Sequence, residues 1–443
     1  MRMPAQGASP KAPPLTAILQ VYRYGLMVGE PAVAGLLAWR SHQGKEDPGR
    51  LPERRGLPGR ARPIGRLVWM HGASVGEILS LVGLVDGMIA RGFSVLVTTG
   101  TRSAADLIGR RLPSGAVHQY VPLDAPRWVG RFLDHWRPDL ALVAESEIWP
   151  NTLVGLHARA IPLILVNGRM SERSYRGWGR SPRTARALLS RIAVCLAQTD
   201  EDAARFAQLG APRVGVSGNL KYDSDVPPVD EQQLAHLRDC LGDRPVWVAA
   251  STHPGEDAMA ARVHAALKQR WPRLLTIVVP RHPHRGGDVV ARAAAEGLRS
   301  ARRSQGGRPH GGVDLYVADT LGELGLFYRL TALVYLGGSL VERGGQNPIE
   351  PTRLGAAVLH GPHIFNFTQV YRALDGAGGA RCVADEADLT AALADLLADP
   401  TRIDTMARAG AAALAPFEGA VDRTLAVLDP FIAQMRLTAM AAQ

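Results

Sequence analysis

Residues 66–99 read RLVWMHGASVGEILSLVGLVDGMIARGFSVLVTT. The runs RLVWMHG and FSVLVTT lack the polar alternation of a half-exposed strand, so they are typical of strands buried on both faces. The segment EILSLVGLVDGMIARG between them has the length and apolar content of a helix. A helix between two buried strands predicts a parallel sheet with helices on both faces.

The same alternation continues to about residue 222 and begins again at residue 245. Further strands are predicted in the first run at VHQYVPL (117–123), PDLALVAESE (138–147), IPLILVNGR (161–169), RIAVCLAQT (191–199) and PRVGVSGN (212–219). In the second run they are predicted at PVWVAAST (245–252), LLTIVVPRH (274–282), VDLYVADT (313–320), ALVYLGGSL (332–340) and AAVLHGPH (356–363). The predicted fold class is α/β, with two doubly wound Rossmann-like domains that face a cleft.

Composition excludes several other classes of protein. The chain has 443 residues, 46% of them hydrophobic and 21% charged, so it can form buried cores and is not a disordered chain. Its 3 cysteines lie far apart without CxxC spacing, which fits a reducing cytosolic environment rather than a disulfide framework or a thiolate metal site. The net charge of +10 fits either a solvated basic surface or attraction to an anionic partner.

The N-terminal region is compatible with membrane association but does not predict a membrane-spanning helix. Residues 15–39 are apolar but are interrupted by Arg23, Glu30 and Pro31, so neither a membrane-spanning helix nor a signal peptide is expected. A helix on an anionic leaflet and a helix packed on the protein's own surface both fit. The following stretch RSHQGKEDPGRLPERRGLPGRARP is rich in Pro, Gly and charge, which indicates a linker or exposed loop.

Three sites in the first half carry candidate chemistry at the ends of predicted strands. Glu77 opens a helix, where it either complements the helix dipole or acts as a general base. Strand alternation would point Glu145 and Glu147 to the same side, as a paired carboxylate site or as a solvated loop. Lys221 is either an ordinary surface lysine or a cation for phosphate or carboxylate.

The second half has a denser set of candidates. Small, basic and polar residues follow its strands in STHPGE (251–256), PRHPHR (280–285), DTLGEL (319–324), GGSLVERGGQNPIEP (337–351) and GPHIFNF (361–367). Asn347, Pro348 and Glu350 fit a helix N-cap with its first turn, and they also fit a phosphate site made by backbone amides. The histidines lack metal-ligand spacing, so no metal is expected.

These motifs, together with HGASVGE, ESEIWPN, NGRMSERS and GNLKYD, occur in one order over about residues 15–425. The ordered set resembles the 3-deoxy-D-manno-octulosonic acid (Kdo) transferases of lipopolysaccharide synthesis. The resemblance implies the glycosyltransferase B architecture, CMP-Kdo as donor and a lipid A precursor of the lipid IVA type as acceptor. It also implies a site at the cytoplasmic side of the cell inner membrane, with its anionic leaflet as a partner and no nucleic acid partner.

The resemblance assigns roles to particular residues. Glu77 is expected to be the general base of an inverting transfer without a cofactor or metal. Glu145 and Lys221 match positions that stabilise the transition state. The positions expected to bind CMP are Pro280, Arg281, Leu321, Gly322, Glu323, Asn347, Pro348, Ile349 and Glu350. Gly72 and Ala73 depart from the larger residues of relatives, which affects the loop but leaves Glu77 in place.

Five segments are therefore expected. They are a membrane-associating segment with a basic linker (1–62), an acceptor-binding domain (63–225), a connection (226–244), a CMP-sugar-binding domain (245–420) and a C-terminal helix (421–443). The arginines of NGRMSERSYRGWGRSPR are hypothesised to border the acceptor site: Arg169, Arg173, Arg176, Arg180 and Arg183. Two alternatives remain, an enzyme that uses a UDP-sugar and an arginine-rich protein that binds membranes or nucleic acid without catalysis.

Overall fold

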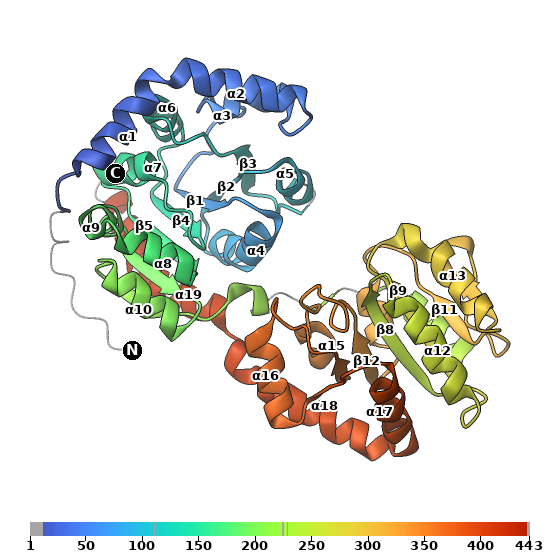
Figure 1. Cartoon of the computed structure of the whole chain (residues 1–443). Helices are drawn as coiled ribbons and strands as arrows, with labels where there is room; N and C mark the ends of the chain where they lie inside the picture. The colour runs from blue at the N-terminus through green and yellow to red at the C-terminus, as the bar shows by residue number, and fades with distance from the viewer. Residues whose placement is uncertain (1–11, 110, 224–225, 228, 441–443) are drawn as a thin grey trace. The chain divides into compact units, whose positions relative to one another are not determined.

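The computed structural model describes residues 12–109, 111–223, 226–227 and 229–440. The chain forms two compact units, labelled by element in Figure 1. The first contains Met1–Ser224 together with Glu418–Gln443, and the second contains Asp225–Phe417. Residues 1–11 of the predicted N-terminal segment and 441–443 of the predicted C-terminal helix lie outside the described residues.

A seven-stranded, all-parallel sheet forms the centre of the first unit. In their order across the sheet, its strands are β3 (Ala116–Tyr120), β2 (Ser94–Thr99), β1 (Leu67–Gly72), β4 (Leu140–Ala144), β5 (Leu163–Gly168), β6 (Val194–Ala197) and β7 (Val214–Val216). The order reverses direction between β1 and β4, which is the topological switch point of a doubly wound sheet. Ligands of such sheets bind where the carboxyl ends of the strands flank this point.

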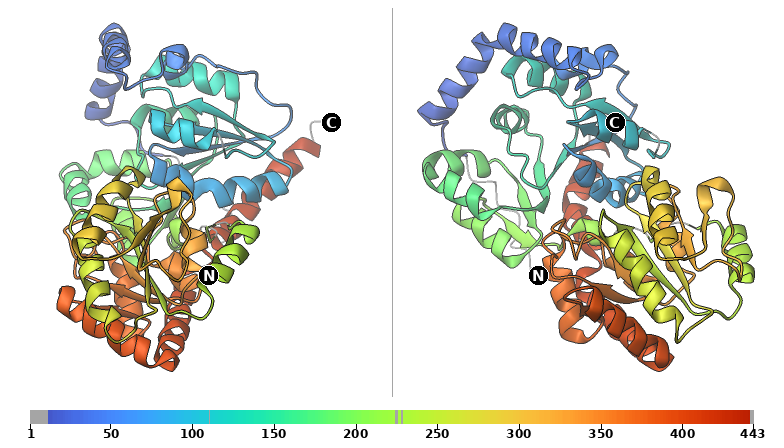
Figure 2. Two further views of the ribbon diagram at one scale, coloured as in Figure 1. Left: turned by 90° about the vertical axis from the view of Figure 1, so that its right-hand side faces the viewer. Right: turned by 45° about the vertical axis from the view of Figure 1, so that its right-hand side comes forward.

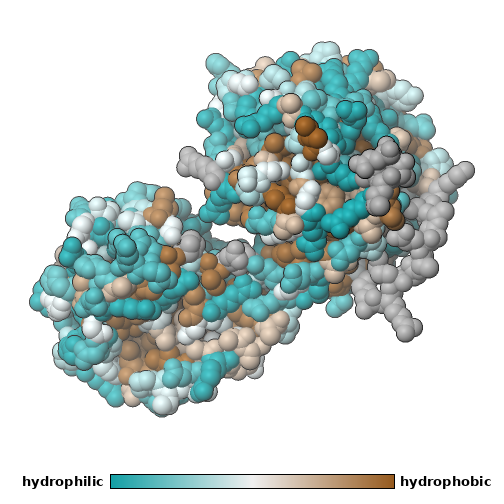
Figure 3. All heavy atoms as spheres, turned by 180° about the vertical axis from the view of Figure 1, so that it is seen from behind, coloured by the Kyte–Doolittle hydropathy of each residue, from teal (hydrophilic) through white to brown (hydrophobic). Residues whose placement is uncertain are grey.

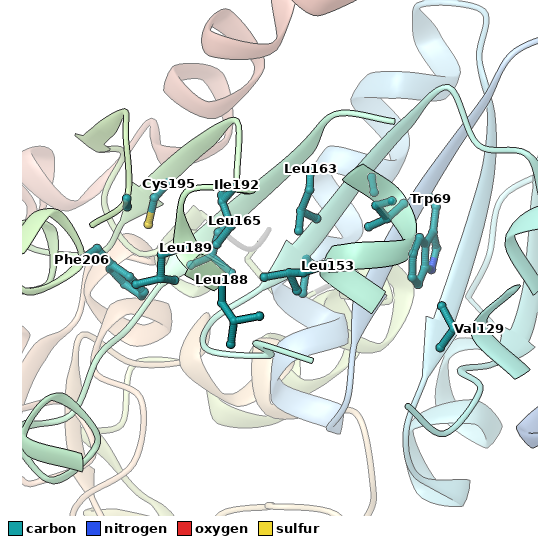
Figure 4. Packing of buried hydrophobic residues seen from close by; sticks show 14 of the residues in the cluster. Trp69, Val129, Leu153, Leu163, Leu165, Leu188, Leu189, Ile192, Cys195 and Phe206 are labelled. Atoms are coloured by element: carbon teal, nitrogen blue, oxygen red, sulfur yellow. The ribbon is translucent and has the colours of Figure 1, made fainter. Parts of the chain in front are cut away.

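Both faces of this sheet are covered by helices. These are α1 (Ala17–Val28), α2 (Glu30–His42), α3 (Leu51–Arg54), α4 (Val75–Ala90), α5 (Arg102–Ile108), α6 (Pro126–Trp136), α7 (Pro150–Ala158), α8 (Glu172–Gly179), α9 (Pro182–Leu189), α10 (Asp200–Gln208) and α19 (Ala420–Met440), with short helices η1 (Pro48–Arg50) and η2 (Leu220–Asp223). Along β1, Leu67 and Trp69 enter one core cluster while Val68 and Met70 enter the other. Figure 4 shows part of the first cluster, with Trp69 near Val129 and Leu153. The continuous apolar run of β1 thus forms a strand that is buried on both faces.

The second unit repeats the architecture. Its parallel strands, in their order across the sheet, are β10 (Ser300–Arg302), β11 (Leu315–Val317), β9 (Leu275–Pro280), β8 (Val246–Thr252), β12 (Leu333–Leu336), β13 (Ala357–His360) and β14 (Ala380–Cys382). Its helices are α11 (Glu231–Leu241), α12 (Glu256–Lys268), α13 (Gly286–Ala295), α14 (Leu324–Tyr328), α15 (Ile349–Arg353), α16 (Thr368–Ala377), α17 (Glu386–Ala398) and α18 (Pro400–Leu414), with η3 (Pro283–Arg285), η4 (Arg303–Gln305) and η5 (Ala415–Phe417). The prediction of two parallel α/β domains is confirmed, and the cleft between them stays a prediction.

The C-terminal helix α19 belongs to the first unit. The Asp223 carboxylate accepts hydrogen bonds from the backbone N–H groups of Gly419 (2.7 Å) and Val421 (2.6 Å). Farther along α19, Leu425 packs against Gly87 of α4, where an added Cβ would lie 2.7 Å from the Leu425 side chain. The sequence predicted this helix but did not assign it to either half.

The N-terminal apolar stretch forms two helices, α1 and α2, that meet at Gly29. Figures 1 and 2 show them in blue along the outside of α6. Leu19 and Leu37 face inward, and the Tyr22 hydroxyl donates a 3.1 Å hydrogen bond to Asp124. The outward side chains are apolar at Ile18, Val21, Tyr24, Val28, Leu36 and Trp39. Among the described residues, no helix combines the length and apolar content that crossing a bilayer requires.

The prediction of an exposed linker is wrong for residues 50–54. The Glu53 carboxylate accepts a 2.7 Å hydrogen bond from the backbone N–H of Tyr120, at the edge strand β3. Arg54 is buried and donates from Nη1 to the Val121 carbonyl at 2.6 Å. These charged side chains take the place of the neighbouring strand that an edge strand lacks. The sequence pattern indicated only that they are polar, and so predicted an exposed loop.

Candidate active site

Glu77 lies in the first turn of α4, directly after β1. The Glu77 carboxylate accepts hydrogen bonds from the Ala73 backbone N–H (2.9 Å) and the Ser74 hydroxyl (2.7 Å), while the Ser74 oxygen accepts from the Glu77 N–H (3.4 Å). This reciprocal arrangement is a variant of the capping box, in which the N–H of Ala73 replaces that of the N-cap residue Ser74. The structural interpretation of Glu77 is therefore confirmed, and because the side chain is only half-buried, the carboxylate remains accessible to a ligand.

Gly72 and Gly76 permit close packing around this turn. A Cβ on Gly72 would lie 2.9 Å from the Ile78 nitrogen, so a larger residue would push the first turn of α4 away from β1. A Cβ on Gly76 would lie 3.7 Å from the Lys221 Nζ, which places this ammonium group beside the turn that carries Glu77. Glu77 and Lys221 are thus brought together although 143 positions separate them in the sequence.

Lys221 forms an ion pair with Glu145 across the carboxyl edge of the sheet. The Lys221 Nζ lies 2.6 Å from the Glu145 Oε1. The Asn167 side chain fixes the neighbouring backbone by accepting a 3.0 Å hydrogen bond from the Leu220 N–H. The structure therefore groups Glu77, Glu145 and Lys221, the three predicted catalytic residues, at one edge of one sheet.

The prediction that Glu145 and Glu147 share one side of a strand is wrong. Strand β4 ends at Ala144, and Glu145 adopts a left-handed backbone conformation with φ of 55°. Strand alternation no longer applies after such a residue, so Glu145 meets Lys221 while Glu147 accepts a 2.5 Å hydrogen bond from the Trp149 indole. Left-handed non-glycine residues cost energy and cluster at functional sites.

The same conformation recurs at two other strand ends. Asn167 in β5 has φ of 53° and Ser251 in β8 has φ of 54°. The pairing of β5 with β6 and of β8 with β9 shifts register at these positions. These local bulges redirect the chain where both sheets present their candidate residues.

Glu147 lies near a second polar group, the buried side chain of His71. The His71 Nδ1 is 3.1 Å from the Thr98 carbonyl oxygen, while its Nε2 is 3.9 Å from the Glu147 Oε2. Burial acts to raise the pKa of Glu147, but His71 and the Trp149 indole outweigh it, so this pKa lies below its ordinary value.

In the second unit, the buried Glu256 fixes the loop that follows β12. This carboxylate is 2% exposed and accepts hydrogen bonds from the His253 N–H (2.9 Å), the Gly338 N–H (2.7 Å) and the Tyr335 hydroxyl (2.8 Å). The Ser339 and Leu340 N–H groups lie within 3.3 Å of it as well. The sequence placed Glu256 in a motif but did not reveal that it binds the GGSL loop.

Leu321, Gly322 and Glu323 follow β11 and precede α14. Leu321 is 83% exposed and Gly322 has φ of +82°, a conformation that favours glycine. The Glu323 carboxylate pairs with the Arg303 guanidinium at 2.5 and 2.7 Å, and these hydrogen bonds lower the pKa of Glu323. No sequence signal pointed to Arg303, because it lies 20 residues from Glu323 and on a different loop.

Asn347, Pro348, Ile349 and Glu350 form the start of α15. The Asn347 side chain accepts a 3.0 Å hydrogen bond from the Ile349 N–H and donates a 3.1 Å bond to the Glu350 carboxylate. Burial raises the pKa of Glu350 above its ordinary value. The helix-start interpretation of these residues is confirmed, and their role toward CMP stays a prediction.

Pro280 ends β9, and Arg281 follows it with an exposed side chain. The His282 ring stacks on His284 with centroids 5.7 Å apart and meets the edge of His253 at 6.3 Å. Within the described part of the chain, no group of His, Cys, Asp or Glu has the arrangement of a metal site. The predicted CMP-binding residues thus gather after β9, β11 and β12, at the carboxyl edge of the second sheet.

The fold and the sequence have known counterparts. A glycosyltransferase from Rickettsia africae is 8% identical, with a TM-score of 0.56, over 84% of this chain and 99% of that one. This likeness and the two parallel sheets show that the chain has the two-domain fold of the glycosyltransferase B architecture. The family described as 3-deoxy-D-manno-octulosonic-acid transferase (kdotransferase) matches residues 49–224.

Relatives extend this match over most of the chain. A 3-deoxy-D-manno-octulosonic acid transferase from Haemophilus influenzae is 34% identical over 92% of this chain and 97% of its own length. A 3-deoxy-D-manno-octulosonic acid transferase from Bordetella pertussis is 38% identical over 84% of this chain and 88% of its own length. The chain therefore belongs to the 3-deoxy-D-manno-octulosonic acid transferase family, and it is a glycosyltransferase.

Proposed function

We propose that the protein transfers Kdo from CMP-Kdo to a hydroxyl group of a lipid A precursor of the lipid IVA type, by one inverting displacement. The observation that carries this proposal is the group of Glu77, Glu145 and Lys221 at the switch point of the first sheet. The acceptor hydroxyl oxygen forms a bond to the anomeric carbon of Kdo. The bond from that carbon to the phosphate oxygen breaks, and CMP leaves with the electron pair.

Glu77 takes the proton of the acceptor hydroxyl in this scheme. Its Oε1 exchanges the Ser74 hydroxyl for the acceptor hydroxyl, while the Ala73 N–H continues to hold Oε2. A carboxylate fixed by a helix start is already oriented, which lowers the cost of reaching a reactive geometry. The reaction requires no cofactor or metal ion, because the nucleotide leaving group already carries its charge on a phosphate.

Lys221 supplies positive charge for the transition state. Glu145 holds the ammonium group at 2.6 Å and limits its orientation. We expect Lys221→Met to lower kcat by about 10²- to 10³-fold, the typical effect of removing one stabilising donor. Glu145→Gln should lower kcat too, and the double variant should be little worse than Lys221→Met because the two residues act as a unit. Steady-state kinetics test this, and additive losses would contradict the pairing.

The second unit binds the CMP part of the donor. Support comes from an exposed loop at Leu321–Gly322, from the exposed Arg281, and from the polar start of α15. Arg281 offers charge to the phosphate, and the backbone at Gly322 can approach a ligand without a Cβ. Arg303 keeps Glu323 ionised and oriented, so it positions this residue rather than contacting the nucleotide.

The N-terminal helices attach the protein to the cytoplasmic leaflet of the cell inner membrane. Support comes from the exposed apolar side chains of α1 and α2, among them Trp39, whose ring lies 5.9 Å from the Lys45 ammonium group. Apolar side chains with flanking cations are the pattern of helices that lie on anionic membranes. Figure 3 shows polar and apolar residues interspersed over the molecular face that it presents.

The arginines that follow β5 are proposed to attract the phosphorylated acceptor. All five are exposed, and Arg176 pairs with Glu172 at 2.7 Å. We expect charge reversal of Arg173 and Arg176 to raise the acceptor KM by about tenfold and to leave CMP affinity unchanged. The control is Arg111→Glu, an exposed arginine between α5 and β3. A loss of CMP affinity without a change in acceptor KM would contradict the assignment.

The direct test is incubation with CMP-Kdo and a lipid A precursor, followed by mass spectrometry of the lipid. The expected product is heavier by one or more Kdo residues, with release of CMP. Competition with CMP and with UDP distinguishes this donor from a UDP-sugar. The proposal would be overturned if the protein bound anionic vesicles but formed no lipid product with any donor.

A further inference from the structure

An apolar pocket lies at the carboxyl edge of the first sheet, beside the turn that carries Glu77. Its volume is about 210 Å³. It lies between the ends of β1 and β4, the start of α7, and the loops after β2 and β3. Its apolar walls include Trp69, Val121, Leu123, Val143 and Leu153. Ala73 lines it too, and the Ala73 N–H holds the Glu77 carboxylate.

Most polar groups in the pocket wall already have hydrogen-bond partners within the protein; the Arg54 Nε and the His71 Nε2 are buried without one among the described residues. The Asp124 carboxylate accepts hydrogen bonds from Tyr22, from the Asn151 and Thr152 backbones, and from the Thr152 hydroxyl. The Trp69 indole donates to Thr98 at 2.8 Å, and the Trp149 indole donates to Glu147. The Arg54 Nη1 is bound to the Val121 carbonyl.

This arrangement distinguishes between possible occupants. A sugar ring would bury several hydroxyl groups against a wall whose polar groups are mostly satisfied, and each unpaired hydroxyl group carries an energetic cost. A hydrocarbon chain would bury only apolar surface and lose no hydrogen bond. The His71 Nε2 is buried without a hydrogen-bond partner among the described residues, so the pocket offers a site for one further polar atom.

The volume of the pocket further restricts which ligands fit. Pockets that enclose a whole small molecule usually have volumes of about 300–1,000 Å³. The smaller volume here fits part of a ligand, such as a segment of a single chain. Behind the wall, Leu123 packs with Leu37 of α2, and the neighbouring Leu36 and Trp39 of the same helix are exposed. A buried apolar cluster therefore joins the pocket wall to α2.

We propose that this pocket binds a segment of one acyl chain of the glycolipid acceptor. The inference rests on the proposed function, because it assumes a glycolipid as the acceptor. Chain binding would position the headgroup beside Glu77 and would favour acylated acceptors over the same headgroup without chains. The walls at Val121 and Leu153 determine how much of the chain is bound.

The test fills the pocket with Val121→Phe. Val121 is partly buried on the loop after β3, and its backbone hydrogen bonds do not depend on its side chain. Val121→Ala enlarges the pocket, and Ile64→Phe adds the same ring at a position that is 99% exposed and outside the pocket. The two acceptors are the acylated lipid A precursor and the same phosphorylated disaccharide without acyl chains.

We expect Val121→Phe to lower kcat/KM for the acylated acceptor by about tenfold or more, as lost burial of a few methylene groups predicts. The rate with the chain-free acceptor, and CMP affinity, should match those of Ile64→Phe. An equal fall with both acceptors would overturn the proposal in favour of a sugar subsite. No fall with either acceptor would overturn it as well.

A binding measurement separates this proposal from the proposed function. A chain-brominated alkyl maltoside should quench tryptophan fluorescence of the wild-type protein through Trp69 and Trp149, and Val121→Phe should weaken that quenching. Equal quenching of the two proteins would overturn the pocket assignment. If quenching differs but no Kdo transfer occurs, the proposed function fails while the apolar pocket stands.

Discussion

Replacing Glu77 by Gln is expected to abolish most Kdo transfer without unfolding the protein. Glutamine at the third helical position can still accept the hydrogen bond of the Ala73 N–H, so the α4 start remains intact and the free energy of unfolding should change by less than about 0.5 kcal/mol. The amide has no lone pair of comparable basicity, so turnover should fall by about 10²- to 10⁴-fold. Product formation, CMP binding and thermal unfolding measured together test this expectation.

Ser74→Ala is the matched control, because it alters the cap but leaves the carboxylate. Losing the N-cap hydroxyl should cost about 1 kcal/mol of stability. Turnover should stay within about tenfold of the wild type, because the Ala73 N–H still orients Glu77. If Glu77→Gln kept wild-type turnover, the carboxylate would be only a helix cap and another base would have to be sought.

Replacing Glu256 by Ala is expected to have the largest effect on stability. The substitution leaves the His253 and Gly338 N–H groups without their acceptor in a nearly solvent-free place, and the Ser339 and Leu340 N–H groups lose it too. Because each buried donor without an acceptor is costly, we expect the free energy of unfolding to fall by about 3–5 kcal/mol. Denaturant unfolding followed by circular dichroism gives the measurement.

The control for Glu256→Ala is Glu296→Ala, a substitution at an exposed position that follows α13 in the second unit. That variant should unfold within about 0.5 kcal/mol of the wild type. Glu256→Ala should also weaken CMP binding, since the loop from Gly337 to Leu340 leads to Asn347. A variant with wild-type stability and a mobile loop would show that the carboxylate orients the loop but contributes little to folding.

The sequence predicted the parallel sheets because their strands are continuous apolar runs between helices. It did not predict β10 and β14, which lie at the two edges of the second sheet and contain only three residues each. Edge strands have fewer neighbours, so their residues are not required to be apolar. SAR in β10 and ARC in β14 therefore lack the pattern on which strand prediction relies.

The candidate site was likewise predicted only in part. The positions of Glu77 in a first helical turn and of Asn347 at a helix start were predicted, because a helix start is encoded within four residues. The pairs Glu145–Lys221 and Arg303–Glu323 join separate loops, so their geometry depends on how the strands are ordered in each sheet. The left-handed turn at Glu145 was missed because glutamate carries no sequence signal for that conformation.

The return of α19 to the first unit has a consequence for biosynthesis. Leu425, Leu428 and Ile432 belong, with Ala420 and Met435, to an apolar core whose remaining buried members all precede residue 221. A ribosome must therefore translate the whole second unit before the first can bury that surface. We infer that the growing chain carries an incomplete first unit until α19 emerges, and that loss of α19 would damage this unit before the second.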